Sequence, residues 1–130
     1  ITDYQFISML GPSGQNQGIL FGDADANWRG QIEYLHNGDT MYFFTAATNR
    51  MNITSAGLTP SADNTYNLGS SSYRWANLHV ADMQLSNVDT GGNEVDGTEG
   101  SWSVQEGEDD IYLINRKNGK RFKIKLEEVE

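Results

Sequence analysis

Hydrophobic residues along this chain occur in short runs rich in Ile, Tyr, Phe, Val and Thr, and clusters of Gly, Asn, Asp and Ser separate the runs. No stretch sustains the spacing of an amphipathic helix, and only 70–77 has room for one helical turn. Short β-rich runs between turn-forming clusters are typical of antiparallel strands. The pattern therefore predicts an all-β fold of short antiparallel strands and hairpins. The predicted strands are 4–10, 18–21, 30–36, 40–45, 50–54, 78–85, 102–105, 111–116 and 121–128.

A first hairpin is predicted at Asn37-Gly38, a dipeptide that favours a two-residue type I′ turn. Such a turn sets the register of the two strands. Leu35 is then opposite Thr40, Tyr34 is opposite Met41, and the pairing continues in this way to Ile32 opposite Phe43. One face of the hairpin then carries Ile32, Tyr34, Met41 and Phe43, and the other mixes polar residues with Leu35, Tyr42 and Phe44. Because Tyr42 and Phe44 would be half exposed in a single chain, we expect another surface to cover this second face.

A second hairpin is predicted at Asn118-Gly119. A two-residue turn there places Leu113 opposite Ile124 and Tyr112 opposite Lys125. One face is then apolar and the other is rich in lysine and arginine, which is typical of an antiparallel pair buried on one side. The strand predicted at 102–105 is expected to extend this hairpin, because an isolated two-stranded hairpin is only marginally stable.

The acidic, glycine-rich segment 89–100 predicts a boundary between two regions of the chain. Residues 1–90 are expected to form a β-rich region, and residues 91–130 an acidic linker followed by a three-stranded C-terminal β unit. The whole chain is thin in hydrophobic residues, at 37% of 130, where a compact domain has about 45–50%. We therefore expect a core that one chain cannot complete alone.

Charge and composition exclude several functions. The net charge of −9 argues against nucleic acid as a partner, and the lack of an apolar run of about 18 residues argues against membrane insertion. Cysteine is absent, and no hydrolase, P-loop or zincin motif occurs. The two histidines, His36 and His79, match no metal-binding spacing, although one histidine per chain could meet at a three-fold axis. No catalytic residue, metal or cofactor is predicted, and the chain is not expected to be an enzyme.

A candidate binding site lies in the polar loop 22–30. Its opening acidic residues have the spacing of a calcium loop, but the required Gly and Glu are replaced by Trp28 and Tyr34, so a turn is predicted instead. Trp28 is large and lies among polar neighbours, where an exposed ring could bind a sugar face. The candidate ligand-binding residues are Asp25, Asn27, Trp28 and Arg29. The alternative is that Trp28 packs back onto the adjacent hairpin.

Two segments carry a resemblance to a known family. Residues 49–58, Asn-Arg-Met-Asn-Ile-Thr-Ser-Ala-Gly-Leu, and residues 66–80, with the core Asn-Leu-Gly-Ser-Ser-x-x-Arg-Trp-x-x-Leu, resemble the distal parts of tailed-bacteriophage tail fibres. The segment 100–119 is similar to the C-terminal ends of fibres from environmental, especially marine, phages. The resemblance covers 18–130, and its arginine–tryptophan stretch is the most specific part.

The resemblance implies an intertwined homotrimeric fibre tip on the outside of a virion, which binds a polysaccharide or protein receptor on the host surface. The motif residues Leu68, Gly69, Arg74, Trp75 and Leu78 would be structural and lie near the trimer axis, and the trimer would also cover Tyr42 and Phe44. Two alternatives remain open: a trimerisation or assembly cap without receptor contact, and a depolymerase or deacetylase that acts on surface polysaccharide.

Overall fold

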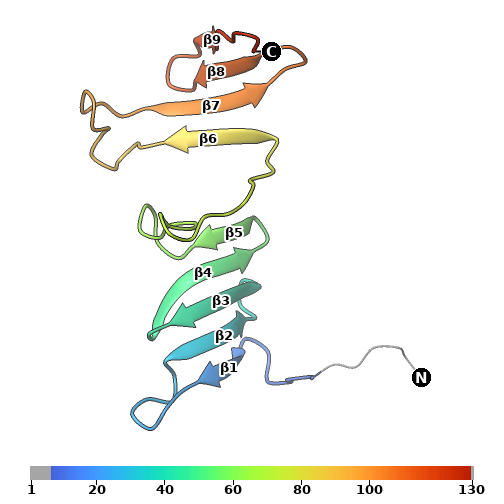
Figure 1. The fold of residues 1–130 in the computed structure, drawn as a ribbon. Coiled ribbons are helices and arrows are strands. Elements are labelled where there is room, and N and C mark those ends of the chain that lie inside the picture. Colours follow the sequence, from blue (N-terminus) through green and yellow to red (C-terminus); the bar gives the residue numbers. More distant parts are fainter. Residues whose placement is uncertain (1–6, 130) are drawn as a thin grey trace. The chain divides into compact units, whose positions relative to one another are not determined.

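The described part of the chain, residues 7–129 of a computed structural model, contains nine strands and no helix (Figure 1). The strands form two antiparallel sheets, and in each sheet the strand order follows the chain. The predicted all-β class of short antiparallel strands is confirmed. The first sheet consists of β1 (Gln17–Phe21), β2 (Gly30–Leu35), β3 (Thr40–Thr45), β4 (Thr48–Thr54) and β5 (Gly57–Pro60). The second consists of β6 (Asp82–Ser86), β7 (Ser101–Glu106), β8 (Ile111–Asn115) and β9 (Arg121–Lys123).

The chain divides into two compact units, Ile1–Leu68 and Gly69–Glu130. This division falls earlier than the boundary expected near residue 90. The reason is that β6 pairs with β7, with Met83 opposite Val104, so the strand before the acidic segment belongs to the second sheet. The segment expected to be a flexible linker is the β6–β7 connection of that sheet.

The first hairpin has the predicted register but a different turn. Leu35 lies opposite Thr40, and the pairing continues to Ile32 opposite Phe43. The positive φ angles fall on Gly38 (114°) and Asp39 (47°), one residue later than a type I′ turn at Asn37-Gly38 requires. The turn is therefore wider than predicted, while the alternation of apolar and polar residues keeps the strands in the expected register.

One face of the first sheet is apolar across all five strands. Two rows of residues cross the sheet on this face, because side chains opposite one another on paired strands point the same way. One row is Ile19, Ile32, Phe43, Met51 and Pro60, and the other is Gln17, Tyr34, Met41, Ile53 and Leu58. No second layer of the same unit buries either row, since none of these residues is buried.

The second hairpin is shifted by two residues from the predicted register. Leu113 lies opposite Phe122 rather than Ile124, and Tyr112 lies opposite Lys123 rather than Lys125. The side-chain oxygen of Asn115 accepts hydrogen bonds from the backbone N–H groups of Lys117 (2.9 Å) and Asn118 (3.3 Å). This cap opens a longer turn than the two-residue loop. Because the shift is even, each residue keeps its predicted face.

The second sheet has one apolar and one polar face. The apolar face carries Met83, Leu85, Trp102, Val104, Leu113 and Phe122, and the rings of Trp102 and Phe122 lie 5.7 Å apart. The opposite face carries a row of Gln84, Ser103, Ile114 and Arg121. The predicted third strand over the terminal hairpin is β7, and β6 adds a fourth.

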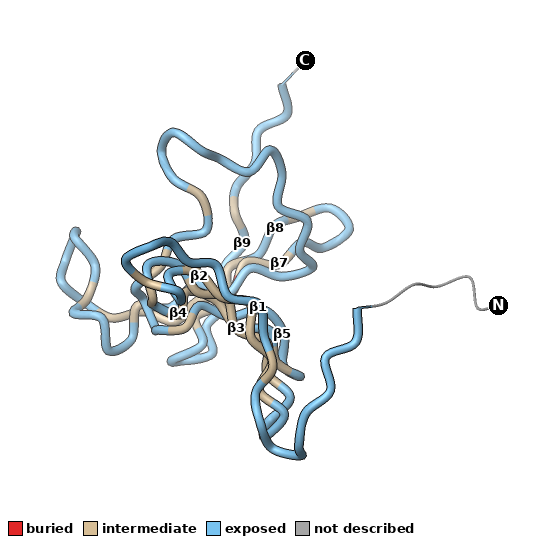
Figure 2. Tube along the Cα trace, turned by 90° about the horizontal axis from the view of Figure 1, so that it is seen from below, coloured by how far each residue is buried: buried red, intermediate tan, exposed pale blue. Residues whose placement is uncertain are grey.

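Buried side chains are nearly absent from the described residues, as Figure 2 shows by its pale blue and tan trace. No hydrophobic residue among them is buried, and the residue that is fully buried is Ser103. The expected shortage of core is therefore a property of the fold.

Four local predictions differ from the structure. Residues 7–10 form no strand, and residues 4–6 of that predicted strand lie outside the described residues. The segment 70–77 forms bends and not a helical turn, since the amide of Ser70 donates to the carbonyl of Tyr73. The last predicted strand ends at Lys123 and the one predicted from residue 78 begins at Asp82. Strand β5 was not predicted.

Candidate functional site

The loop between β1 and β2 is organised by Asp23. Its side-chain oxygen accepts hydrogen bonds from the backbone N–H groups of Asp25 and Ala26, both at 3.0 Å. The backbone N–H of Asp23 donates to the carbonyl of Ala26 at 2.9 Å. This is the turn geometry that short acidic side chains favour, so the predicted turn is present at this aspartate.

The four candidate ligand-binding residues all lie on this loop and are exposed: Asp25, Asn27, Trp28 and Arg29. Trp28 exposes 50% of its surface, so half of the ring is open to a ligand. The carbonyl of Arg29 accepts a hydrogen bond from Ala47 at 2.9 Å, which ties the loop to the β3–β4 turn. The arrangement offers one aromatic face beside a carboxylate, an amide and a guanidinium, which are the groups that bind sugar rings and their hydroxyls.

The motif residues belong to the segment that follows β5 and precedes β6 in the sequence, and their side chains are exposed. Leu68, Trp75 and Leu78 expose 74%, 69% and 63% of their surface. Gly69 has φ +86°, a conformation that favours glycine, and the indole of Trp75 lies close against it. Arg74 is also exposed. Their role near a trimer axis stays a prediction.

Tyr42 and Phe44 lie together on the second face of the first sheet. Their rings are 6.2 Å apart in an edge-to-face arrangement, and both residues are half-buried, as expected for one chain. On the neighbouring strand, the side-chain nitrogen of Asn49 donates to Asn52 at 2.7 Å. The side-chain oxygen of Asn49 is buried and has no hydrogen-bond partner among the described residues. A buried acceptor of this kind is costly unless a donor reaches it.

A polar site on the second sheet was missed by the sequence analysis. The hydroxyl of Ser103 donates to the side-chain oxygen of Gln84 at 2.5 Å and accepts from Nε of Arg116 at 2.7 Å. A cavity of about 570 Å³ opens beside this network; its lining residues are Asp82, Gln105, Glu106, Tyr112, Ile114, Arg116 and Arg121. The alternating positive residues Arg121, Lys123 and Lys125 indicated a charged face in the sequence. The residues that fix Arg116 are Ser103 and Gln84, and they come from the strands β7 and β6, which are distant in the sequence.

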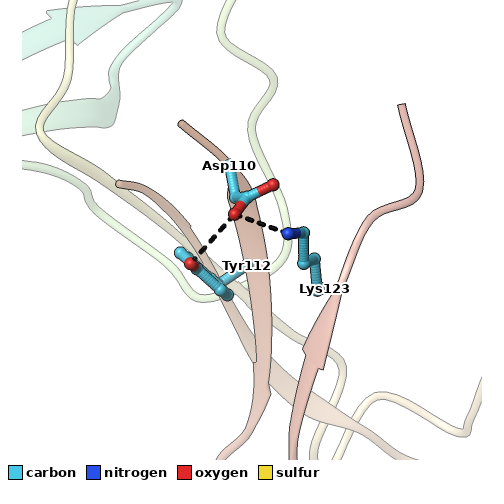
Figure 3. A network of polar contacts seen from close by, with 3 residues as sticks. All are labelled: Asp110, Tyr112 and Lys123. Atoms are coloured by element: carbon cyan, nitrogen blue, oxygen red, sulfur yellow. Dashed lines mark hydrogen bonds and ion pairs between the residues drawn. The ribbon is translucent and has the colours of Figure 1, made fainter. Parts of the chain in front are cut away.

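Next to this cavity, Asp110 joins two side chains from β8 and β9 (Figure 3). Its carboxylate accepts from Nζ of Lys123 at 2.7 Å and from the hydroxyl of Tyr112 at 3.3 Å. The hydrogen bond to Asp110, followed by its negative charge, raises the pKa of Lys123 above the ordinary 10.5. The lysine is exposed and the aspartate is partly buried, so the main effect of the pair is to orient the lysine along the polar face.

The β6–β7 connection is held by a network of short polar side chains. The side-chain oxygen of Asn93 accepts from the amides of Val95 (2.8 Å) and Asp96 (3.1 Å). The carboxylate of Asp96 accepts from the amide and the hydroxyl of Thr98 at 3.0 and 2.7 Å. The backbone hydrogen bond from Thr98, followed by those from the side chains of Thr98 and Asn93, lowers the pKa of Asp96 below 3.8. This segment is thus an ordered loop.

His36 lies in the turn after β2, beside side chains of the first sheet. His36 contacts the side chain of Gln17 and lies edge-on to the ring of Tyr34, at 4.9 Å between ring centres. The described residues contain no group of three or more His, Cys, Asp or Glu side chains arranged to hold a metal ion. The same residues form no helix long and apolar enough to cross a membrane.

Comparison with known proteins gave no relative. No protein-family model, curated protein or solved structure matches this chain.

Proposed function

We propose that this chain is the distal part of a phage tail fibre, which associates as a homotrimer on the virion surface and binds a host-surface glycan without enzymatic activity. The observation that carries the proposal is the apolar face that crosses all five strands of the first sheet without a covering layer. A chain that leaves such a face open in isolation needs partners to bury it.

The open faces of the sheets support more than one neighbour for each chain. No hydrophobic residue among the described residues is buried. In a closed three-fold ring each chain has two interfaces, and these would cover its open faces.

The second face of the first sheet supports the same arrangement. Tyr42 and Phe44 present large, half-buried rings there. A neighbouring chain packed on this face would cover these rings. The loop 22–30 then remains the candidate receptor site, because its side chains are polar and Trp28 is half exposed.

Light scattering combined with a glycan array tests the proposal. We expect a mass of three chains of 14.5 kDa each, and binding to at least one bacterial surface glycan. Trp28→Ala is expected to lose that binding and keep the mass. Tyr73→Ala is the control, since it removes an exposed aromatic ring outside the loop. A mass of one chain for the wild-type protein would contradict the fibre proposal.

The assembly-cap alternative is favoured by one observation, the open apolar face of the second sheet. This face could serve association alone. A trimer that binds no glycan on the array, with or without Trp28, would support the cap instead of the receptor-binding tip.

A further inference from the structure

The positive charges of this acidic chain are concentrated in one short segment. Residues 116–125 carry six of the nine lysines and arginines and no acidic residue, so the rest of the chain has a net charge of −15. These six are Arg116, Lys117, Lys120, Arg121, Lys123 and Lys125. Such a concentration in a chain of opposite overall sign indicates a local function for the charge.

Two of these residues, Arg116 and Arg121, line the same cavity on the polar face of the second sheet. Arg121 lies opposite Ile114 on β8, which in turn lies opposite Ser103 on β7. Arg116 is fixed from the side, because its Nε donates to the buried hydroxyl of Ser103 at 2.7 Å. Among the described residues, an ion pair forms between Lys123 and Asp110. Neither the two terminal nitrogens of Arg116 nor the guanidinium of Arg121 makes an ion pair with these residues.

The remaining lining of the cavity is polar and acidic. Asp82 accepts a hydrogen bond from Gln105 at 2.7 Å, and Glu106 and Tyr112 complete that part of the wall. The two acidic side chains in this part of the wall would repel a carboxylate of the ligand. They would accept hydrogen bonds from sugar hydroxyls, and Tyr112 offers an aromatic edge. The cavity has a volume of about 570 Å³. This volume lies within the range of ordinary ligand pockets, which is about 300–1,000 Å³.

We infer that this cavity binds an acidic saccharide, with the carboxylate of a uronic acid held by Arg116 and Arg121 and its hydroxyls directed at Asp82, Gln105 and Glu106. The planar guanidinium group matches a carboxylate with two parallel hydrogen bonds. The buried serine holds one of the two arginines in place before the ligand arrives, which lowers the entropy lost on binding. Because the apolar face of the same sheet is the one that needs covering, the polar face stays open to ligand.

This inference goes beyond the proposed function, since the cavity lies in the unit that does not contain Trp28. It can fail while the glycan site at the loop 22–30 holds, and the reverse is equally possible. The two are separated by variants that leave the other site intact.

Isothermal titration calorimetry on the full chain tests the inference with a galacturonic acid hexamer. We expect the hexamer to bind and the neutral maltohexaose not to. Arg121→Gln should weaken binding at least about tenfold, the effect of losing hydrogen bonds to a charged group. Arg116→Lys should weaken it as well, because lysine keeps the charge but loses the planar fork.

The matched control is Lys120→Gln, which removes the same charge from the adjacent turn, outside the lining of the cavity. A change of less than about twofold in this variant supports a discrete site. An equal loss in Lys120→Gln and Arg121→Gln would show diffuse attraction and overturn the inference. Titration with linear polyphosphate distinguishes a phosphate ligand from a saccharide carboxylate. If polyphosphate bound as tightly as the galacturonic acid hexamer, the saccharide assignment would be overturned. A drop in oligomer mass in Arg121→Gln would assign the charges to chain association instead.

Discussion

The two sheets differ in how large apolar side chains are distributed over their two faces. The first sheet has such residues on both faces, since Tyr42 and Phe44 lie opposite the continuous apolar face. The second sheet has one apolar face and one polar face on which Ser103 fixes Arg116. In the proposed trimer, the first sheet would therefore be covered on both sides and the second on one side.

The largest expected effect comes from a charge on the apolar face of the first sheet. Phe43→Glu would place a carboxylate in the middle of the face that neighbouring chains cover in the proposed trimer, at a cost of about 3 kcal/mol or more. We expect the mass measured by light scattering to fall to that of one chain. Gln84→Glu is the control, because it puts the same charge on the polar face of the second sheet and keeps an acceptor for Ser103. If Phe43→Glu retained the wild-type mass, the first sheet would not be the association surface.

A smaller effect distinguishes the two hairpin turns. Asn115→Ala removes the oxygen that accepts from Lys117 and Asn118, and the loss of such a cap costs about 1 kcal/mol of unfolding free energy. Asn37→Ala is expected to be neutral, since the positive φ angles of the first turn fall on Gly38 and Asp39. Urea denaturation of both variants measures the difference. A destabilised Asn37→Ala protein would instead support the two-residue turn that the sequence favours.

The smallest effect concerns the long connection of the second sheet, which depends on an ionised carboxylate. The pKa of Asp96 is lowered, chiefly by the backbone hydrogen bond from Thr98. The ionised carboxylate therefore stabilises the loop above the ordinary pKa of 3.8, and this stabilisation is lost as the pH falls through the lowered pKa. Below pH 3.8 we expect faster amide hydrogen exchange at Thr98 when rates are corrected for pH. Asp96→Asn should remove this pH dependence. An unchanged rate down to pH 2 would contradict the assignment.

Strand positions could be predicted from the sequence because period-two alternation is a local signal. It located β2, β3 and the register between them, since any shift by one residue would have turned Ile32 and Phe43 to the polar face. It missed β5, because Gly57–Pro60 is short, contains proline and lies at the edge of its sheet. It also misplaced the terminal register by two residues, since a shift of two leaves every face unchanged and only the cap at Asn115 decides between the alternatives.

The candidate sites were predictable to different degrees for a similar reason. The loop with Trp28 is contiguous in sequence, so its exposed aromatic ring and polar neighbours could be identified directly. The cavity with Arg116 and Arg121 depends on Ser103 and Gln84, which come from β7 and β6 and meet only through strand pairing. Residues brought together by pairing between distant segments leave no local pattern. The unit boundary was misplaced on the same account, because the pairing of β6 with β7 spans the acidic segment.

The sequential order of the strands has a consequence for how the protein comes into being. Every strand in each sheet pairs with its neighbour along the chain, from β1 to β5 and from β6 to β9. Contacts between nearby segments form fast, because little loop-closure entropy is lost before each pairing is made. Each sheet can therefore form as the chain leaves the ribosome, before any other copy is encountered. Assembly of the proposed trimer would then be the slow, concentration-dependent step, in which preformed sheets with open apolar faces must meet before they aggregate.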